Sequence, residues 1–146
     1  MKTTATARDV MQKKVVTVRP NMLVRELARL LDEKRISGAA VVDGGGALVG
    51  VVSKSDLVHH ELEGGESFIA PVARLPEGFH VESPDRTTVS DIMTPGAIEA
   101  SADAPVPELA RLMRRRRIHR VFITKGRKLL GIVTTLDLLK VLETGS

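Results

Sequence analysis

The sequence predicts an α/β (α+β) domain of two β-α-β-β-α repeats related by a pseudo-twofold axis, with the sheets packed together and helices on the flanks. The first reason is a repeated heptapeptide: GVVSKSD at residues 50–56 and GIVTTLD at 131–137 lie 81 residues apart. The second is that longer patterns around it also recur. The third is length, because a unit of roughly 55 residues is marginal alone, whereas two units in 146 residues can share one core.

The repeat extends well beyond the heptapeptide. RDVM at 8–11 matches SDIM at 90–93, and the pattern V-x-E-L-A-x-L at 24–30 recurs at 106–112, both at an offset of 82. The offset falls to 81 only after a glycine turn that is one residue longer in the first copy. A surface turn is where a repeat tolerates a change of length.

Local patterns predict the same elements in each copy. The first copy has a strand at 15–18, a helix opened by Pro20-Asn21, strands at 39–42 and 48–52, and a helix from Ser53 or Ser55 through Leu62. The second has a strand near Ile98, a helix opened by Asp103-Ala104-Pro105, strands at 121–124 and 129–133, and a helix at 135–142. We therefore expect repeat 1 at 1–62, an acidic insertion at 63–88 that packs partly, and repeat 2 at 89–146, with the two repeats in one compact module.

Charge is distributed unevenly along a chain whose net charge is +4. Residues 59–89 hold six acidic and two basic side chains, so the repeats carry the positive excess. A basic body can attract nucleic acid, anionic lipid or a phosphorylated small molecule. The three phenylalanines are too few for a platform that stacks single-stranded bases.

Several protein classes are excluded by composition. The chain has no cysteine, which excludes disulfides, thiol catalysis and cysteine-ligated metals. It begins without the apolar core of a secretory signal, and no run approaches the roughly 20 apolar residues of a membrane helix. No nucleophile, base and orienting residue form a recognisable set. We expect a soluble, cytoplasmic protein that is not an enzyme.

The heptapeptide supports two interpretations. In one, Ser53 with Asp56 and Thr134 with Asp137 form capping boxes at helix starts. In the other, the N–H groups of the helix start bind a phosphate and the aspartate accepts from two ribose hydroxyls. The β-branched pair would then form an apolar wall for a base, and the glycine would allow close approach. Local physics leaves both open.

The repeated motifs together resemble a known family. The duplicated D-[VI]-M start, the P-x-x-x-V-x-E-L-A helix and the G-h-h-[ST]-x-x-D ending, where h is apolar, resemble a tandem pair of cystathionine-β-synthase (CBS) domains over 8–62 and 89–143. Such a pair forms a Bateman module whose two clefts commonly bind AMP, ADP, ATP or another adenosyl ligand, with S-adenosylmethionine and NAD as further candidates. The resemblance implies a regulatory sensor that forms a homodimer and acts on an unknown partner protein.

The resemblance also implies two unequal clefts. In cleft A, Asp137 would bind the ribose hydroxyls and Thr134 would contact ribose or phosphate. His119 and Arg120 resemble a phosphate-binding His-Arg pair in the γ subunit of AMP-activated kinase. The base would lie near Met11, Val16, Ile36 and Ser37.

In cleft B, Asp56 and Ser53 would take the ribose roles. The base would lie near Met93, Ile98 and Ile118. Gly38 stands where Arg120 stands in the other copy, so Lys54 is the substitute phosphate ligand and lower occupancy is expected.

Two further hypotheses remain open. The four arginines at 114–117 suggest a basic nucleic-acid-binding protein, although consecutive helical residues point around the cylinder and suit a solvated helix end. Alternatively, the chain is a ligand-free structural dimerisation module whose heptapeptides only cap helices. His59-His60-Glu61 suggests a metal, but adjacent helical residues do not face one another, so no metal is expected.

Overall fold

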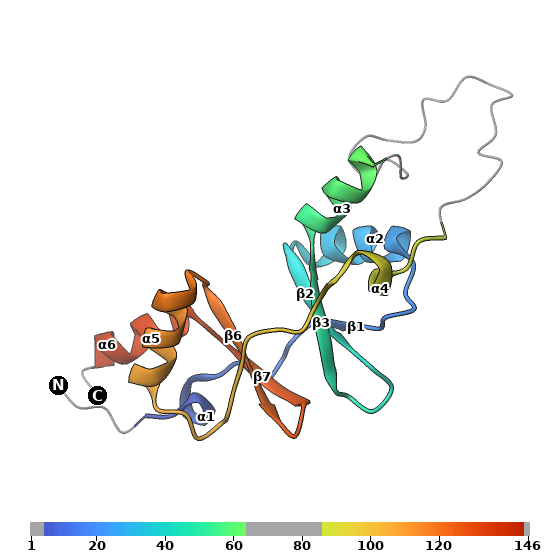
Figure 1. Ribbon diagram of the computed structural model, residues 1–146. Helices are drawn as coiled ribbons and strands as arrows, with labels where there is room; N and C mark the ends of the chain where they lie inside the picture. Colours follow the sequence, from blue (N-terminus) through green and yellow to red (C-terminus); the bar gives the residue numbers. More distant parts are fainter. Residues whose placement is uncertain (1–4, 64–85, 145–146) are drawn as a thin grey trace, which may run out of the picture.

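The computed structural model describes residues 5–63 and 86–144, which form two small sheets with helices packed against them (Figure 1). The first half contains α1 (Ala7–Val10), β1 (Thr17–Val18), α2 (Val24–Lys34), β2 (Gly38–Val42), β3 (Leu48–Ser53) and α3 (Lys54–Leu62). The second contains α4 (Val89–Ile92), β4 (Thr94–Pro95), β5 (Glu99–Ala100), α5 (Val106–Arg116), β6 (Arg120–Lys125), β7 (Lys128–Thr134) and α6 (Thr135–Thr144). The predicted fold class is confirmed. The expectation for the insertion falls mainly on 64–85, outside the described residues.

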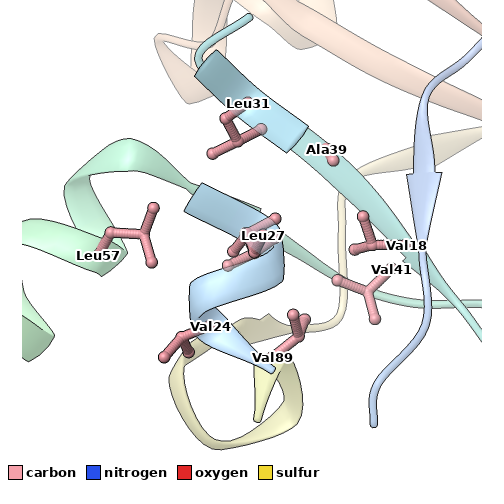
Figure 2. Packing of buried hydrophobic residues seen from close by; sticks show 9 residues of the cluster. Val18, Val24, Leu27, Leu31, Ala39, Val41, Leu57 and Val89 are labelled. Carbon is pink, nitrogen blue, oxygen red and sulfur yellow. The ribbon is translucent and has the colours of Figure 1, made fainter. Parts of the chain in front are cut away.

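The two long helices have the apolar faces that the sequence predicts. In α2, Val24, Leu27 and Leu31 are buried, and Figure 2 shows them gathered with Val41 of β2 and Leu57 of α3. Helix α5 repeats this face with buried Val106, Leu109 and Met113. Burial of these side chains gives each half a hydrophobic cluster of its own.

The two sheets share one pairing scheme. In the first, the order is β1-β2-β3-β4, with β1 parallel to β2 and the other pairs antiparallel. In the second, the order is β5-β6-β7, with the first pair parallel and the second antiparallel. Buried Ala40, Leu48 and Phe122, from strands of both sheets, form a third cluster, so the sheets pack together as predicted.

The start of each repeat crosses into the other repeat. Strand β4 lies in the second half of the chain but pairs with β3 of the first (Figure 1). Reciprocally, the Gln12 N–H donates to the Ile132 carbonyl of β7 at 2.8 Å, and the Ile132 N–H donates back at 3.0 Å. The repeats therefore exchange their first segments.

The short helices α1 and α4 take part in the same exchange. Ala7 of α1 is buried in the cluster of the second half, and its N–H donates to the Ala104 carbonyl at 2.8 Å. Val89 of α4 is buried in the cluster of the first half, and its N–H donates to the Met22 carbonyl at 2.8 Å. Neither helix was predicted, because four residues are too few to display a helical period.

Candidate functional site

Each heptapeptide joins a strand to a capped helix. The Ser53 N–H and hydroxyl donate to Asp56 Oδ2 at 2.8 and 3.1 Å, and the Asp56 N–H donates to Ser53 Oγ at 3.4 Å. Thr134 and Asp137 repeat these contacts at 2.8, 2.9 and 3.4 Å. The capping interpretation is therefore confirmed at the starts of α3 and α6.

The same cap also begins both short helices. The Thr6 N–H donates to Asp9 Oδ2, and the Thr88 N–H donates to Asp91 Oδ2, each at 2.8 Å. These backbone bonds, and then the threonine hydroxyls, hold the pKa of Asp9 and Asp91 below the ordinary 3.8, because they stabilise the charged carboxylate. Since α1 and α4 are capped without the rest of the heptapeptide, capping alone does not explain the longer motif.

The glycine of each heptapeptide lies where the exchanged segment crosses the strand. A Cβ on Gly50 would lie 2.7 Å from the Thr94 carbonyl oxygen and 2.8 Å from Met93 Sδ. A Cβ on Gly131 would lie 2.7 Å from the carbonyl oxygen of Gln12, with the Met11 Sδ at 2.9 Å. Such distances are too short for any side chain. The D-[VI]-M motif and the heptapeptide therefore recur together, because the heptapeptide glycine of each repeat contacts the methionine of the other repeat.

A cleft of about 540 Å³ lies beside the first heptapeptide. This volume lies within the range of small-molecule sites. Both repeats line it. The apolar part of its wall is formed mainly by Val51, Val52, Ala97, Ile98, Ile118 and Phe122. Its polar lining consists of Ser37, Ser53, Lys54, Ser55, Asp56, Thr94, Arg117, His119 and Arg120.

Positive charge dominates the polar part of this cleft. Lys54, Arg117 and Arg120 line it together with His119, whereas Asp56 is the one carboxylate among the lining residues. Helix α3 begins at the same place, so its N-terminal N–H groups add partial positive charge. This arrangement suits an anion that also presents hydroxyl groups to a carboxylate.

The cleft contains members of both predicted residue sets. Ser53, Lys54, Asp56, Ile98 and Ile118 come from predicted cleft B, and Ser37, His119 and Arg120 from predicted cleft A. Ser37 lies here because its carbonyl accepts from the Lys54 N–H at 2.8 Å, beside the cap of its own repeat. Met93 packs on Gly50 instead of lining the cleft.

The other residues of predicted cleft A lie in two places. Met11 packs on Gly131 of β7, the strand that ends at Thr134, and Asp137 lies in the first turn of α6. The Asp137 side chain is almost fully buried, and the Gln12 amide donates to its Oδ1 and Oδ2 at 3.1 and 3.2 Å. Val16 and Ile36 pack against the hydrophobic cluster of the first half.

Comparison with known proteins identifies the family. The sequence profile of the CBS domain matches residues 7–63 and 89–144. The chain belongs to the CBS domain family. An uncharacterized protein of Methanocaldococcus jannaschii is 32% identical over 92% of this chain and 89% of its own length. A second relative from that organism is longer, and the chain spans 38% of it.

Solved structures of CBS pairs share the fold. CBSX2 in complex with AMP is 26% identical, with a TM-score of 0.75 over 97% of this chain and 99% of that one. The CBS domain of a membrane protein from Sphaerobacter thermophilus is 33% identical, with a TM-score of 0.69 over 93% and 86%. A CBS pair in complex with 5′-methylthioadenosine and S-adenosyl-L-methionine, 23% identical with a TM-score of 0.71 over 99% and 100%, supports the fold alone.

Sequence reasoning missed several residues near Asp56 and Asp137. Gln12 and Thr94 follow Met11 and Met93 at matching repeat positions, so the repeat alignment could have identified them. Arg117, the C-cap of α5, lines the cleft but was treated only as part of a charge run. Phe122 could not be identified from the sequence as a cleft residue, because an apolar residue in a strand is expected to belong to the hydrophobic core.

The other candidate features described below lack the combination of basic side chains, a carboxylate and an apolar wall that the cleft beside Asp56 has. A larger concavity of about 650 Å³ lies along α5, but Glu99, Asp103 and Glu108 offset its arginines. Within residues 5–63 and 86–144, no three histidine or carboxylate side chains gather as metal ligands would. Over the same residues, no helix has both the length and the apolarity needed to cross a bilayer.

Proposed function

We propose that this CBS pair is a regulatory module that binds an adenine nucleotide beside Asp56 and acts on a partner protein. The observation that carries the proposal is the cleft, where a single carboxylate, a helix N-terminus and several basic side chains lie next to an apolar wall. The likeness to CBSX2, solved with AMP, supports an adenosyl ligand.

The ribose would bind at the Asp56 carboxylate. Among the described contacts, the capping hydrogen bonds of Asp56 end on Oδ2, which leaves Oδ1 to accept from a ribose hydroxyl. The phosphates would lie toward Lys54, Arg117 and Arg120, and the base against the apolar wall. Capping and ligand binding thus use the same aspartate at the same time.

The charge of the cleft favours a phosphorylated nucleotide over S-adenosylmethionine. Two arginines and a lysine oppose one carboxylate in the lining, so each added phosphate gains attraction. The sulfonium of S-adenosylmethionine carries positive charge and would be repelled. We expect affinity to rise from AMP through ADP to ATP, with NADH below ATP and S-adenosylmethionine weakest.

Ligand binding can be tested by thermal melting and calorimetric titration with AMP, ADP, ATP, NADH and S-adenosylmethionine in turn. A ligand that binds only the folded state adds about 2.7 kcal/mol of stability at a hundredfold excess over its dissociation constant. Asp56→Asn should weaken ATP binding at least about 10-fold, because loss of a charged hydrogen bond costs about 1.5–3 kcal/mol. The matched Asp137→Asn should leave that affinity unchanged. No shift with any ligand at millimolar concentration would contradict the proposal.

Regulation would follow from the position of the cleft between the repeats. A ligand that contacts both repeats prefers one arrangement of them, and a partner can respond to that arrangement. Exposed leucines on the outer helices support a protein contact: Leu62 of α3 is 78% exposed, and Leu136 and Leu142 of α6 are 69% and 77% exposed. We propose a homodimer through such surfaces, which sedimentation at several concentrations tests.

A ligand-free scaffold is the second candidate. The observation in its favour is that the shared residues of the heptapeptide have structural roles: the hydroxyl and the aspartate cap a helix, and the glycine makes room for the exchanged segment. A stable dimer that binds none of the five ligands would support this candidate.

A further inference from the structure

We propose that Gln12 closes the second cleft, the one predicted at Thr134 and Asp137 of the other heptapeptide, so that each chain binds one nucleotide, beside Asp56. Residue 12 and its counterpart Thr94 would then decide which cleft is open. The inference rests on the proposed function. It adds how many nucleotides each chain binds and which residue determines that number.

Gln12 and Thr94 occupy equivalent places in the exchanged segments. Each follows the methionine that packs on a heptapeptide glycine. Gln12 pairs with Ile132 of β7, and Thr94 pairs with Val51 of β3. Since the backbones run alike, the difference between the two positions is the length and chemistry of one side chain.

That difference coincides with a difference between the two aspartates. Both are capped with nearly the same distances, so the helix starts are alike. Asp137 is nevertheless 2% exposed, and the Gln12 amide donates to both of its oxygens. Asp56 is half-buried and lines the open cleft together with Thr94.

A ribose at Asp137 would have to displace the Gln12 amide. The ribose hydroxyls would have to donate to the same carboxylate oxygens that already accept from the Gln12 amide. A hydrogen bond to a charged group is among the stronger ones in proteins, so this displacement is costly. Threonine is too short to span the same distance. We expect the Gln12 contact to weaken nucleotide binding at the second cleft by about 10- to 100-fold.

The test is the number of ATP molecules bound per chain, measured by calorimetry and equilibrium dialysis on the full chain. At ATP concentrations that saturate the Asp56 cleft but stay below the dissociation constant of the weakened second cleft, wild type should bind one molecule. Gln12→Thr should bind two, and adding Asp137→Asn should remove the second. The reciprocal Thr94→Gln should lose the first site. Circular dichroism and melting show beforehand that each variant is folded, and Gln12→Ala replaces Gln12→Thr if the latter is not.

The outcomes separate this inference from the proposed function. Two equal sites in wild type, or a single site in the folded Gln12 variant, would overturn the role of Gln12 and leave nucleotide binding intact. No ATP bound by wild type or by any variant would overturn both. One site in wild type that becomes two only without Gln12 is the supporting result.

Discussion

At Gly50 and Gly131, the absence of a side chain allows the exchanged segment to pack directly against the strand. Gly50→Ala would place a methyl group 2.7 Å from the Thr94 carbonyl, so β4 has to move away from β3. We expect a loss of about 1–3 kcal/mol in the free energy of unfolding, the usual cost of overpacking. Urea unfolding measures it.

Gly45→Ala is the matched control, because its new Cβ would meet only Asp43 Oδ1, at 3.5 Å. This variant should lie close to wild type in stability. Equal losses at Gly45 and Gly50 would show that crowding by the exchanged segment is not the reason why both heptapeptides begin with glycine.

The sequence could predict which residue types belong to the site, but not which of these residues lie together. Ser53 and Asp56 could be identified from the heptapeptide, because a hydroxyl and an acid at that spacing serve a helix start. The sequence could not show that His119 and Arg120 line the cleft of Asp56, since that depends on how two repeats pack. Nor could it show Gln12 on Asp137, a contact across 125 residues of sequence.

At the scale of elements, the caps of α1 and α4 make stability depend on pH. The pKa of Asp9 and Asp91 is lowered in the folded protein, first by the backbone N–H of the capping threonine. A carboxyl with a depressed folded pKa adds stability above its unfolded pKa and loses it as pH falls through the folded value.

The double variant Asp9→Asn and Asp91→Asn should therefore be less stable than wild type at pH 7. The difference should shrink as the pH falls below about 4, where wild-type carboxylates become protonated. Urea unfolding between pH 7 and pH 3 measures the two curves. Asp32→Asn, exposed on α2, is the control, and a difference that persists unchanged to pH 3 would contradict the linkage.

Helices α2 and α5 are each followed by a C-cap arginine in the left-handed region. Arg35 and Arg117 each have a φ of 54°, a conformation that costs an L-residue about 1–2 kcal/mol. Glycine removes that cost, although its greater freedom in the unfolded chain takes back about 0.5–1 kcal/mol. Arg35→Gly should therefore raise stability by up to about 1 kcal/mol, measured by thermal melting.

Arg117→Gly should give the same gain in stability but weaker ATP binding, because Arg117 lines the cleft and Arg35 does not. Calorimetric titration of the two variants separates the effects. Equal ATP affinity in both would argue against Arg117 as a phosphate contact.

For the whole molecule, periodicity was enough to predict the architecture. Apolar spacing predicted α2 and α5, and β-branched runs around glycine turns predicted the hairpins, because burial there is local in sequence. The exchange of α1 and α4 was not predictable in this way. Four residues carry no period, and their partners lie in the opposite half.

The exchange makes a prediction about which sheet a mutation loosens. Val89 is fully buried in the cluster of the first half, although it begins the second repeat in sequence. Val89→Ala removes two methyl groups from that cluster and should cost about 2 kcal/mol. Hydrogen exchange should accelerate in β2 and β3 more than in β6 and β7. Ala7→Gly, in the cluster of the second half, should give the opposite pattern. If Val89→Ala instead loosened β6 and β7, the strands of its own repeat, each repeat would be an independent unit and the exchange would not hold in solution.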